Sequence, residues 1–282
     1  MGSVAAPDMS AAWYRRLASA ALEQRIASGL RRRMREVYAE QRLRAALGLM
    51  QAPWLRAPRI ALRGDFESLP ESRALKGAFH KAMQAVHGPP ALVRDMDGMS
   101  GQKYRAWINA LVRQHPDARY LEIGSWLGST AVSAMYGNAL EVLCIDNWSE
   151  FGGPKAQFFE NIERARSPSV RFRFIESDYR QVDYTALGTF NIYLFDGPHS
   201  EQEQYDGIML VRPALDKRVI IIVDDWNWPS VRIGTFRALR DAGFKIEAAI
   251  DITTTRGNVP PPALGKGTDW HNGYFLSVCT AP

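Results

Sequence analysis

The feature that most constrains the fold is an alternation, from residue 119 onward, of short apolar runs with segments of helical character. Most of these runs are apolar without a break, as expected for parallel strands that are buried on both faces of a sheet. Strands that alternate with helices indicate βαβ units, so we predict an α/β fold built on a doubly wound, Rossmann-like sheet. The expected strands are residues 119–123, 141–145, 170–175, 192–195, 219–223, 245–252 and 274–278.

The last two runs differ from the others in their connection. Residues 253–273, which join them, are rich in Thr, Gly and Pro and contain no helical segment. Parallel neighbours need a long crossover, usually a helix, whereas antiparallel neighbours do not. We therefore expect the final pair of strands to be antiparallel.

The first 63 residues have a charge of their own. They contain twelve arginines and four acidic residues, a net charge of +8, so that residues 64–282 carry −3 of the total of +5. Helical periodicity over residues 10–50 predicts a basic helical extension, whose apolar stripe must be buried against the main domain or in a homo-oligomer. The stripe is Leu22, Ile26, Leu30 and Met34. Its cationic side could touch nucleic acid, but a solvated helix face is the simpler interpretation.

Three regions follow from these patterns: the extension over residues 1–63, a helical lead-in or cap over residues 64–116, and the predicted sheet domain over residues 117–282. The lead-in includes an expected helix from about residue 100 to residue 114.

The cellular setting is inferred from cysteines and hydropathy. Cys144 and Cys279 each lie inside an apolar run, which favours buried, reduced thiols over a disulfide framework. No apolar stretch reaches the length of a membrane span, and arginines recur from Arg15 onward where a signal peptide would need an apolar core. We expect a cytoplasmic protein with no membrane partner.

The first expected strand runs into a glycine-containing turn, in the sequence YLEIGSWLGST over residues 120–130. Gly124 and Gly128 bracket the turn between this strand and the next helix, where a side chain would block a ligand. The spacing is E-x-G-x-x-x-G and not the dinucleotide form G-x-G-x-x-G, which argues against an NAD-dependent dehydrogenase. It suits a nucleoside with an amino-acid tail, although a purely structural turn remains an alternative.

The ends of the next two strands carry side chains that suit such a nucleoside. Asp146 follows the second strand, where a carboxylate can accept hydrogen bonds from both ribose hydroxyls. Ser177 and Asp178 follow the third strand and would lie beside an adenine, on which Trp148 could stack. Three consecutive strand ends with fitting side chains are harder to obtain by chance than one.

The region from about Met99 to the C-terminus resembles the class I S-adenosylmethionine (SAM)-dependent methyltransferases. Within them it is most similar to the cation-dependent O-methyltransferases of the catechol and caffeoyl-CoA type and to antibiotic-sugar O-methyltransferases. The resemblance implies a seven-stranded sheet of order 3-2-1-4-5-7-6 with an antiparallel seventh strand, and SAM as cofactor. The cofactor-binding residues that we expect are Glu122, Gly124, Ser125, Gly128, Thr130, Asp146, Trp148, Ser177, Asp178 and Asp196.

In this resemblance, Glu122 and Gly124 line the methionine part of SAM, Thr130 meets its carboxylate, Asp146 holds the ribose, and Asp178 lies near the adenine amino group.

The resemblance also implies a metal site. Asp196, Asp224 and Asp225 stand where the cation-dependent enzymes have their ligands, after the fourth and fifth strands. Adjacent carboxylates beyond an apolar strand are costly unless they are solvated or hold a cation. Oxygen-only ligands suit Mg²⁺, so we expect a magnesium ion here. The alternative is that Asp224 and Asp225 cap a helix or bind loop amides.

His199, three residues after Asp196, matches the position of a general base. An imidazole near neutrality can accept the proton of a hydroxyl held on the metal. A loop histidine that only hydrogen-bonds its neighbours is the alternative, and Pro198, an unusual residue at its place, could re-aim the ring. A second departure is that residues 216–218, Asp-Lys-Arg, replace the usual Gly-Gly turn.

Segments 99–105, 149–155 and 253–273 are expected to shape the acceptor pocket. The predicted function is magnesium-assisted methyl transfer from SAM to a small-molecule hydroxyl, in secondary metabolism or sugar modification. One rival is a SAM-dependent RNA methyltransferase that grips nucleic acid with residues 1–63, but the acidic catalytic face argues against a nucleic-acid partner. The other is a non-catalytic SAM-binding or assembly protein.

Overall fold

The computed structural model describes residues 58–84, 89–255 and 265–282, all within a compact unit that spans Arg56–Pro282. The predicted amphipathic helix over residues 10–50 lies outside the described residues, and so does the self-association expected of it. None of the helices in the described part is long and apolar enough to cross a membrane.

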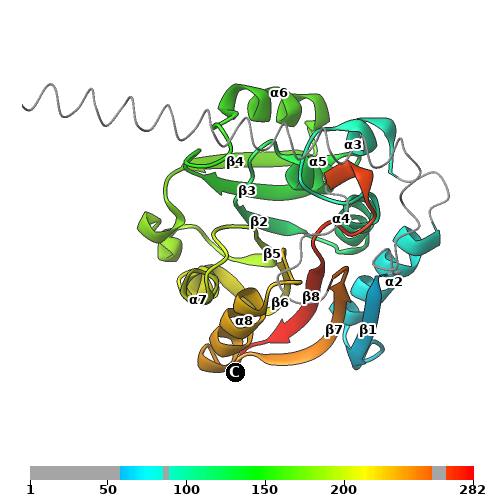
Figure 1. The fold of residues 1–282 in the computed structure, drawn as a ribbon, viewed down its shortest axis with the longest axis vertical. Helices are drawn as coiled ribbons and strands as arrows, with labels where there is room; N and C mark the ends of the chain where they lie inside the picture. The colour runs from blue at the N-terminus through cyan, green and yellow to red at the C-terminus, as the bar shows by residue number, and fades with distance from the viewer. Residues whose placement is uncertain (1–57, 85–88, 256–264) are drawn as a thin grey trace, which may run out of the picture. The chain divides into compact units, whose positions relative to one another are not determined.

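The described residues form one eight-stranded sheet in the order β1-β7-β8-β6-β5-β2-β3-β4 (Figure 1). From β4 to β6 the five neighbouring strands are parallel, and β8 is antiparallel to both β6 and β7. The seven predicted strands therefore occur in the predicted order with the antiparallel final pair. The strands are β1 (Arg59–Gly64), β2 (Arg119–Ile123), β3 (Leu140–Asp146), β4 (Val170–Glu176), β5 (Phe190–Phe195), β6 (Leu215–Val223), β7 (Lys245–Thr253) and β8 (Tyr274–Thr280).

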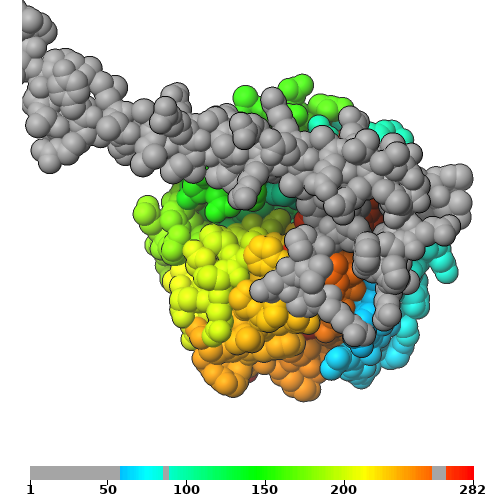
Figure 2. Space-filling model, in the orientation of Figure 1, coloured from blue at the N-terminus to red at the C-terminus, as the bar shows by residue number. Residues whose placement is uncertain are grey.

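The eighth strand, β1, was not predicted. Residues 59–63 were expected at the end of the helical extension, whereas Arg59–Gly64 pairs antiparallel with β7 at the sheet edge. Figure 2 shows β1 (blue) at the surface next to β7 (orange). Six residues are too few for a reliable periodicity, and an edge strand that is largely exposed lacks the continuous apolar pattern of the central strands.

Helices cover both faces of the sheet (Figure 1). Consecutive residues of a strand point to opposite faces, and Val142 and Leu143 of β3 accordingly belong to two separate apolar clusters. The first cluster lies under α2 (Pro70–Gln84), α4 (Gln102–Gln114), α5 (Ser129–Met135) and α6 (Lys155–Ala165). The second lies under α7 (Glu201–Met209) and α8 (Pro229–Asp241). Short helices α3 (Ala91–Asp95), η1 (Tyr179–Gln181), η2 (Tyr184–Ala186), η3 (Arg212–Ala214) and η4 (Gly265–Gly267) complete the described elements.

Two smaller predictions are confirmed. The expected helix near residues 100–114 is α4, Gln102–Gln114. Cys144 and Cys279 are both free and buried, as their apolar surroundings indicated.

Candidate functional site

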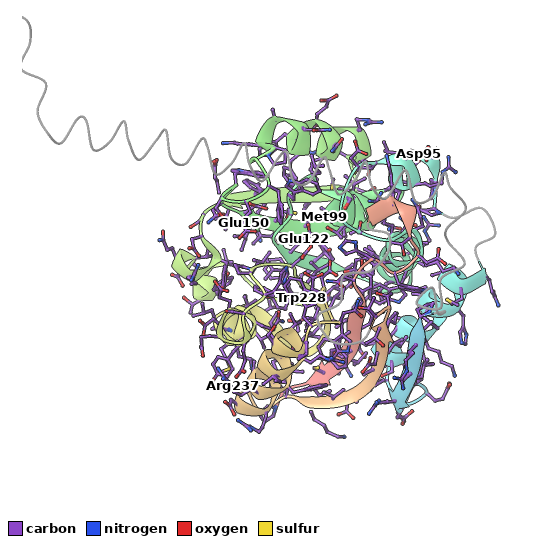
Figure 3. The ribbon with its side chains drawn as sticks, viewed as in Figure 1. Asp95, Met99, Glu122, Glu150, Trp228 and Arg237 are labelled. Atoms are coloured by element: carbon purple, nitrogen blue, oxygen red, sulfur yellow. The ribbon has the colours of Figure 1, made fainter. Side chains whose placement is uncertain are left out.

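The predicted acidic residues meet at one edge of the sheet. Parallel strands run in the same direction, so their carboxyl ends lie together. Neighbouring strand ends are joined by backbone hydrogen bonds, from Asp196 N to Ile123 O at 2.9 Å and from Ser177 N to Asp146 O at 3.2 Å. Asp224 follows β6, the next strand after β5. In Figure 3, Glu122, Met99 and Trp228 lie near the centre of the molecule with Glu150 to their left, whereas Arg237 and Asp95 lie near its rim.

The turn after β2 is shaped by its glycines. Gly124 has φ +84° and Gly128 has φ +80°, conformations that L side chains rarely adopt. Gly128 is the N-cap residue of α5, and a Cβ there would lie 3.0 Å from the Phe158 ring. The turn thus needs glycine for its backbone and for its packing.

Asp146 ties this turn to the end of β3. Its Oδ2 accepts hydrogen bonds from the backbone N–H groups of Ser125 and Trp126, both at 2.9 Å, and its Oδ1 accepts one from Trp148 N at 2.8 Å. A carboxylate can accept about four hydrogen bonds. Asp146 therefore orders the loop around the predicted ribose position and retains limited capacity for a ligand.

Glu122 is buried at the end of β2. Burial raises its pKa to about 7, although the hydrogen bond from the Tyr120 hydroxyl opposes the shift. The Tyr120 hydroxyl donates to Oε2 at 2.5 Å, whereas Oε1 is buried and has no hydrogen-bond partner in the described part of the chain. An unpartnered buried carboxylate oxygen is the acceptor that an ammonium group requires.

The residues predicted around the adenine already have partners. The Trp148 ring stacks on Phe174 with centroids 5.4 Å apart and meets the Phe158 ring edge-on at 5.3 Å. Asp178 accepts a hydrogen bond from Arg180 N at 2.9 Å and pairs with Arg180 Nε at 3.1 Å. The Ser177 hydroxyl donates to Asp178 O at 3.1 Å. These residues lie at the predicted strand end, but their side chains are engaged within the protein.

His199 and Asp225 form a hydrogen-bonded pair between the ends of β5 and β6. His199 Nε2 lies 2.8 Å from Asp225 Oδ2, and the other carboxylate oxygen accepts a hydrogen bond from Asn272 Nδ2 at 2.6 Å. The Trp228 ring meets the His199 ring edge-on, with centroids 5.1 Å apart. His199 Nδ1 has no hydrogen-bond partner among the residues that the structure describes. The ring of His199, which follows Pro198, therefore points its Nε2 at Asp225.

The contact between His199 and Asp225 shifts the pKa of each residue. Burial alone would lower the pKa of His199, but the hydrogen bond to Asp225 and its negative charge raise it above the ordinary value. Burial alone would raise the pKa of Asp225, but the hydrogen bond from His199 holds it below the usual range. Each group therefore favours the charged form of the other.

The three predicted metal ligands lie close together, but their oxygens face different partners. Asp225 contacts His199 and Asn272, whereas Asp224 Oδ1 accepts the Asp225 N–H at 2.6 Å. Burial, together with the negative charges of the neighbouring aspartates, raises the pKa of Asp196 to about 7 and that of Asp224 well above its usual range. In the described ranges no group of three or more His, Cys, Asp or Glu side chains is arranged to hold a metal ion. The magnesium site that we predicted is therefore not supported within the described residues.

Asn272, which donates a hydrogen bond to Asp225, was not predicted individually, although it lies in segment 253–273, which was expected to shape the acceptor pocket. It precedes β8, an antiparallel strand that begins at the edge where the parallel strands end. The sequence feature that could have indicated Asn272 is its position as a polar residue just before the predicted antiparallel strand. Trp270 and His271, which precede Asn272 in the same segment, are buried as well.

Comparison with known proteins finds a similarity over part of this chain. Residues 121–226 match the family model described as a methyltransferase domain, and this range contains Glu122, Asp146, His199 and Asp225. A search of curated proteins found no match to the sequence.

Solved structures of similar fold include three methyltransferases or proteins assigned as such. A methyltransferase of Podospora anserina with bound S-adenosylhomocysteine has 16% identity and a TM-score of 0.47, and the match covers 76% of this chain and 98% of that one. A protein of Klebsiella pneumoniae assigned as an O-methyltransferase has 16% identity, a TM-score of 0.42 and coverages of 78% and 92%. A protein of Pyrococcus horikoshii assigned as an RNA methyltransferase has 12% identity, a TM-score of 0.45 and coverages of 74% and 96%. These likenesses are too distant to indicate a substrate.

Proposed function

We propose that residues 121–226, which match a methyltransferase domain, transfer a methyl group from SAM. On this premise, the protein methylates a hydroxyl group of a small molecule, and His199 is the base. The observation that carries the proposal is the His199–Asp225 contact at 2.8 Å, which leaves Nδ1 of the imidazole without a partner in the described part of the chain.

Residues at the ends of β2 and β3 would hold the cofactor. The unpartnered Glu122 Oε1 suits the ammonium group of its methionine part, and Asp146 with the turn that it orders suits the ribose. When bound, SAM supplies a methyl group on a cationic sulfur that leaves as a neutral thioether. A cation beside Glu122 would also compensate the buried carboxylate.

The hydrogen bond to Asp225 fixes the histidine tautomer. Nε2 donates its proton to Oδ2, so Nδ1 carries the free lone pair of the neutral ring. His199 can accept the proton of the acceptor hydroxyl at Nδ1 as the oxygen forms its bond to the methyl carbon. The buried carboxylate of Asp225 then stabilises the imidazolium that results.

The proposal contains no step through a metal ion. Both oxygens of Asp225 already have partners among the described residues, His199 and Asn272. The small-molecule acceptor accords with the charge of −3 on residues 64–282, which does not favour a phosphate backbone.

The experiment measures SAM binding and turnover separately. The full-length chain is titrated with SAM by calorimetry and then assayed for S-adenosylhomocysteine with a panel of phenols, sugars, hydroxylated amines and bulk RNA. We expect binding, turnover with a small hydroxylated compound, and a loss of at least about tenfold in kcat for His199→Ala with unchanged SAM affinity. Turnover on RNA alone, SAM binding without any turnover, or full activity of His199→Ala would overturn the proposal.

A further inference from the structure

The residue that holds the His199–Asp225 pair in place comes from the turn before β8, the antiparallel neighbour of β6. Asn272 is buried, with 5% of its surface exposed, in the turn before β8. Its Nδ2 donates to Asp225 Oδ1 at 2.6 Å, and its Oδ1 accepts a hydrogen bond from Asn227 Nδ2 at 2.8 Å. Both ends of this amide are therefore used.

The orientation of the two amides follows from groups that can only donate. The backbone N–H groups of Thr254 and Thr255 point at Asn227 Oδ1, at 2.9 and 3.3 Å. A backbone N–H cannot accept, so this atom of Asn227 must be the oxygen and Nδ2 must face Asn272. Asn272 in turn presents its oxygen to Asn227 and its N–H₂ group to Asp225. The backbone N–H groups that follow β7 thus determine that Asp225 faces the N–H₂ group of Asn272 and not its oxygen.

The turn that carries Asn272 is itself well anchored. Trp226 N donates to Gly273 O at 3.2 Å and Asn227 N to Asn272 O at 3.1 Å. Gly265 N donates to His271 Nδ1 at 2.9 Å, and burial lowers the pKa of His271 to about 4, so this ring stays neutral near pH 7.

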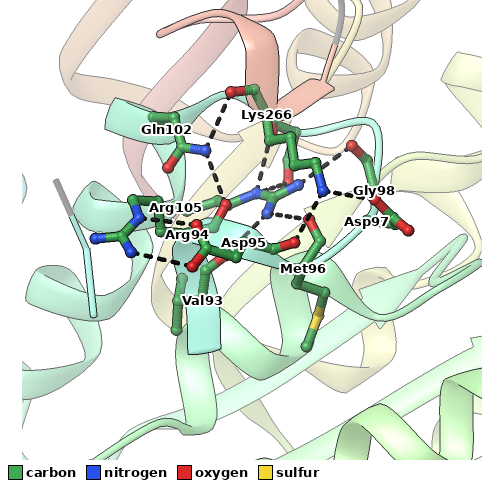
Figure 4. Close-up of polar contacts among 10 residues, drawn as sticks. Val93, Arg94, Asp95, Met96, Asp97, Gly98, Gln102, Arg105 and Lys266 are labelled. Atoms are coloured by element: carbon green, nitrogen blue, oxygen red, sulfur yellow. Dashed lines mark hydrogen bonds and ion pairs between the residues drawn. The ribbon is translucent and has the colours of Figure 1, made fainter. Parts of the chain in front are cut away.

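Further contacts join η4, the short helix that precedes this turn, to the start of α4 and the segment before it (Figure 4). Lys266 Nζ donates to Asp95 O at 2.9 Å and pairs with Asp97 Oδ1 at 2.7 Å, and Gln102 Nε2 donates to Lys266 O at 3.1 Å. Arg105 organises the same segment, because its buried guanidinium donates to the carbonyl oxygens of Val93, Met96, Gly98 and Ser100 and to the Ser100 hydroxyl.

A carboxylate with one donor can rotate about its side-chain bonds, whereas donors on both oxygens fix its plane. Asp225 has φ +54°, so its backbone leaves the strand in a tight turn, and the contacts of its two oxygens determine where the carboxylate points. With Oδ1 held by Asn272, Oδ2 faces His199 Nε2 and the imidazole keeps Nδ1 free.

We propose that Asn272 is the positioning residue of the catalytic pair: it holds Asp225 so that His199 keeps one tautomer and presents Nδ1 to the acceptor hydroxyl. This inference rests on the proposed function for its catalytic meaning. The geometric part, the influence of Asn272 on the His199 ring, holds with or without turnover.

The test replaces Asn272 in the full-length chain. Asn272→Ala removes the donor, and Asn272→Asp keeps the shape but puts an acceptor against Asp225. Asn138→Ala is the matched control, because Asn138 is about as buried as Asn272 but precedes β3, where the parallel strands begin and not where they end. Nitrogen NMR of the His199 ring in the free protein reports the tautomer, and steady-state kinetics report kcat and KM.

We expect both Asn272 variants to broaden or shift the His199 ring signals and to lower kcat by about 10–100-fold, with the SAM Kd unchanged. In the Asp225→Asn background the second substitution should cost little more, because the two residues act as a unit. Asn138→Ala should leave the His199 signals unchanged. Unchanged signals with a kcat within twofold of wild type would overturn the inference. Changed signals in a protein without any methyl transfer would sustain the positioning of His199 and overturn the proposed function instead.

Discussion

A Cβ atom at Gly124 would lie 1.9 Å from the carbonyl oxygen of Asp196. The turn after β2 and the end of β5 therefore share a backbone contact that leaves no room for a methyl group. This contact sets the spacing between the predicted cofactor turn and the carboxylates on the neighbouring strand. It also makes Gly124 the most sensitive position of the motif.

Gly124→Ala should destabilise the protein by about 2–4 kcal/mol and weaken SAM binding, because the new methyl adds a clash to the cost of a positive φ. Urea unfolding and calorimetry measure the two effects. Gly188→Ala is the matched control, with φ +83° and nothing within 4 Å of the added Cβ, so it should cost about 1–2 kcal/mol. Equal effects of the two substitutions would contradict the importance of the contact.

The rate of methyl transfer should rise with pH through a pKa above the ordinary histidine value. His199 must be neutral to accept a proton, and Asp225 raises its pKa despite the opposing effect of burial. Asp225→Asn removes the negative charge, so the acid limb of the kcat profile should move to lower pH while the maximal rate falls. An acid limb that does not move in this variant would exclude His199 as the titrating group.

The pH dependence of folding should carry the signature of Glu122. Burial raises its folded pKa from 4.5 to about 7, so the folded state binds this proton more tightly than the unfolded state. The stabilisation is complete below about pH 4.5 and is lost as the pH rises towards 7, by about 3 kcal/mol at most.

Glu122→Gln should accordingly be more stable than wild type at pH 8 and less dependent on pH between 5 and 8, while it loses affinity for SAM. Thermal unfolding at the two pH values and calorimetry measure these changes. Glu160→Gln, an exposed substitution on α6, is the control and should change neither property. An identical pH dependence of wild type and Glu122→Gln would contradict the prediction.

Removal of divalent cations should leave the rate unchanged within about twofold, since the oxygens of Asp225 are used by His199 and Asn272. The assay compares protein dialysed against EDTA with the same protein after addition of Mg²⁺ or Mn²⁺. A rate that depends on the cation would mean that Asp225 turns away from His199 when an ion binds, and it would restore the magnesium site predicted from sequence.

Arg105→Met should destabilise the chain by about 3–5 kcal/mol. The substitution leaves the carbonyl groups around the buried guanidinium without their donor. Arg94→Met, on the exposed side of the same segment, should change stability by less than about 1 kcal/mol. Urea unfolding of both variants decides the matter, and a small effect at Arg105 would show that water replaces its hydrogen bonds.

Much of the architecture was predictable because its signals are local or follow from strand direction. Continuous apolar runs such as that of β6 are readable one segment at a time. Because the carboxyl ends of parallel strands lie at the same edge of a sheet, the sequence predicted that Glu122, Asp146 and Asp196 lie near one another. The edge strand β1 had too short and too exposed a pattern to be recognised.

By itself the sequence determined seven of the eight strands and the edge at which the chemically active residues meet, because apolar periodicity and parallel strand direction are properties of the chain. The order of those seven strands was implied by the family resemblance. Only the tertiary structure decided the partners of each oxygen. Asp225 was predicted beside a metal, but its donors are His199 and Asn272, the latter 47 residues along the chain. Which donor faces which oxygen depends on side-chain rotation and on backbone groups from other strands, such as Thr254 N on Asn227. Local sequence does not encode these contacts between residues that lie far apart in the chain. Yet the contacts decide whether Asp225 pairs with a histidine or is free to bind a metal ion.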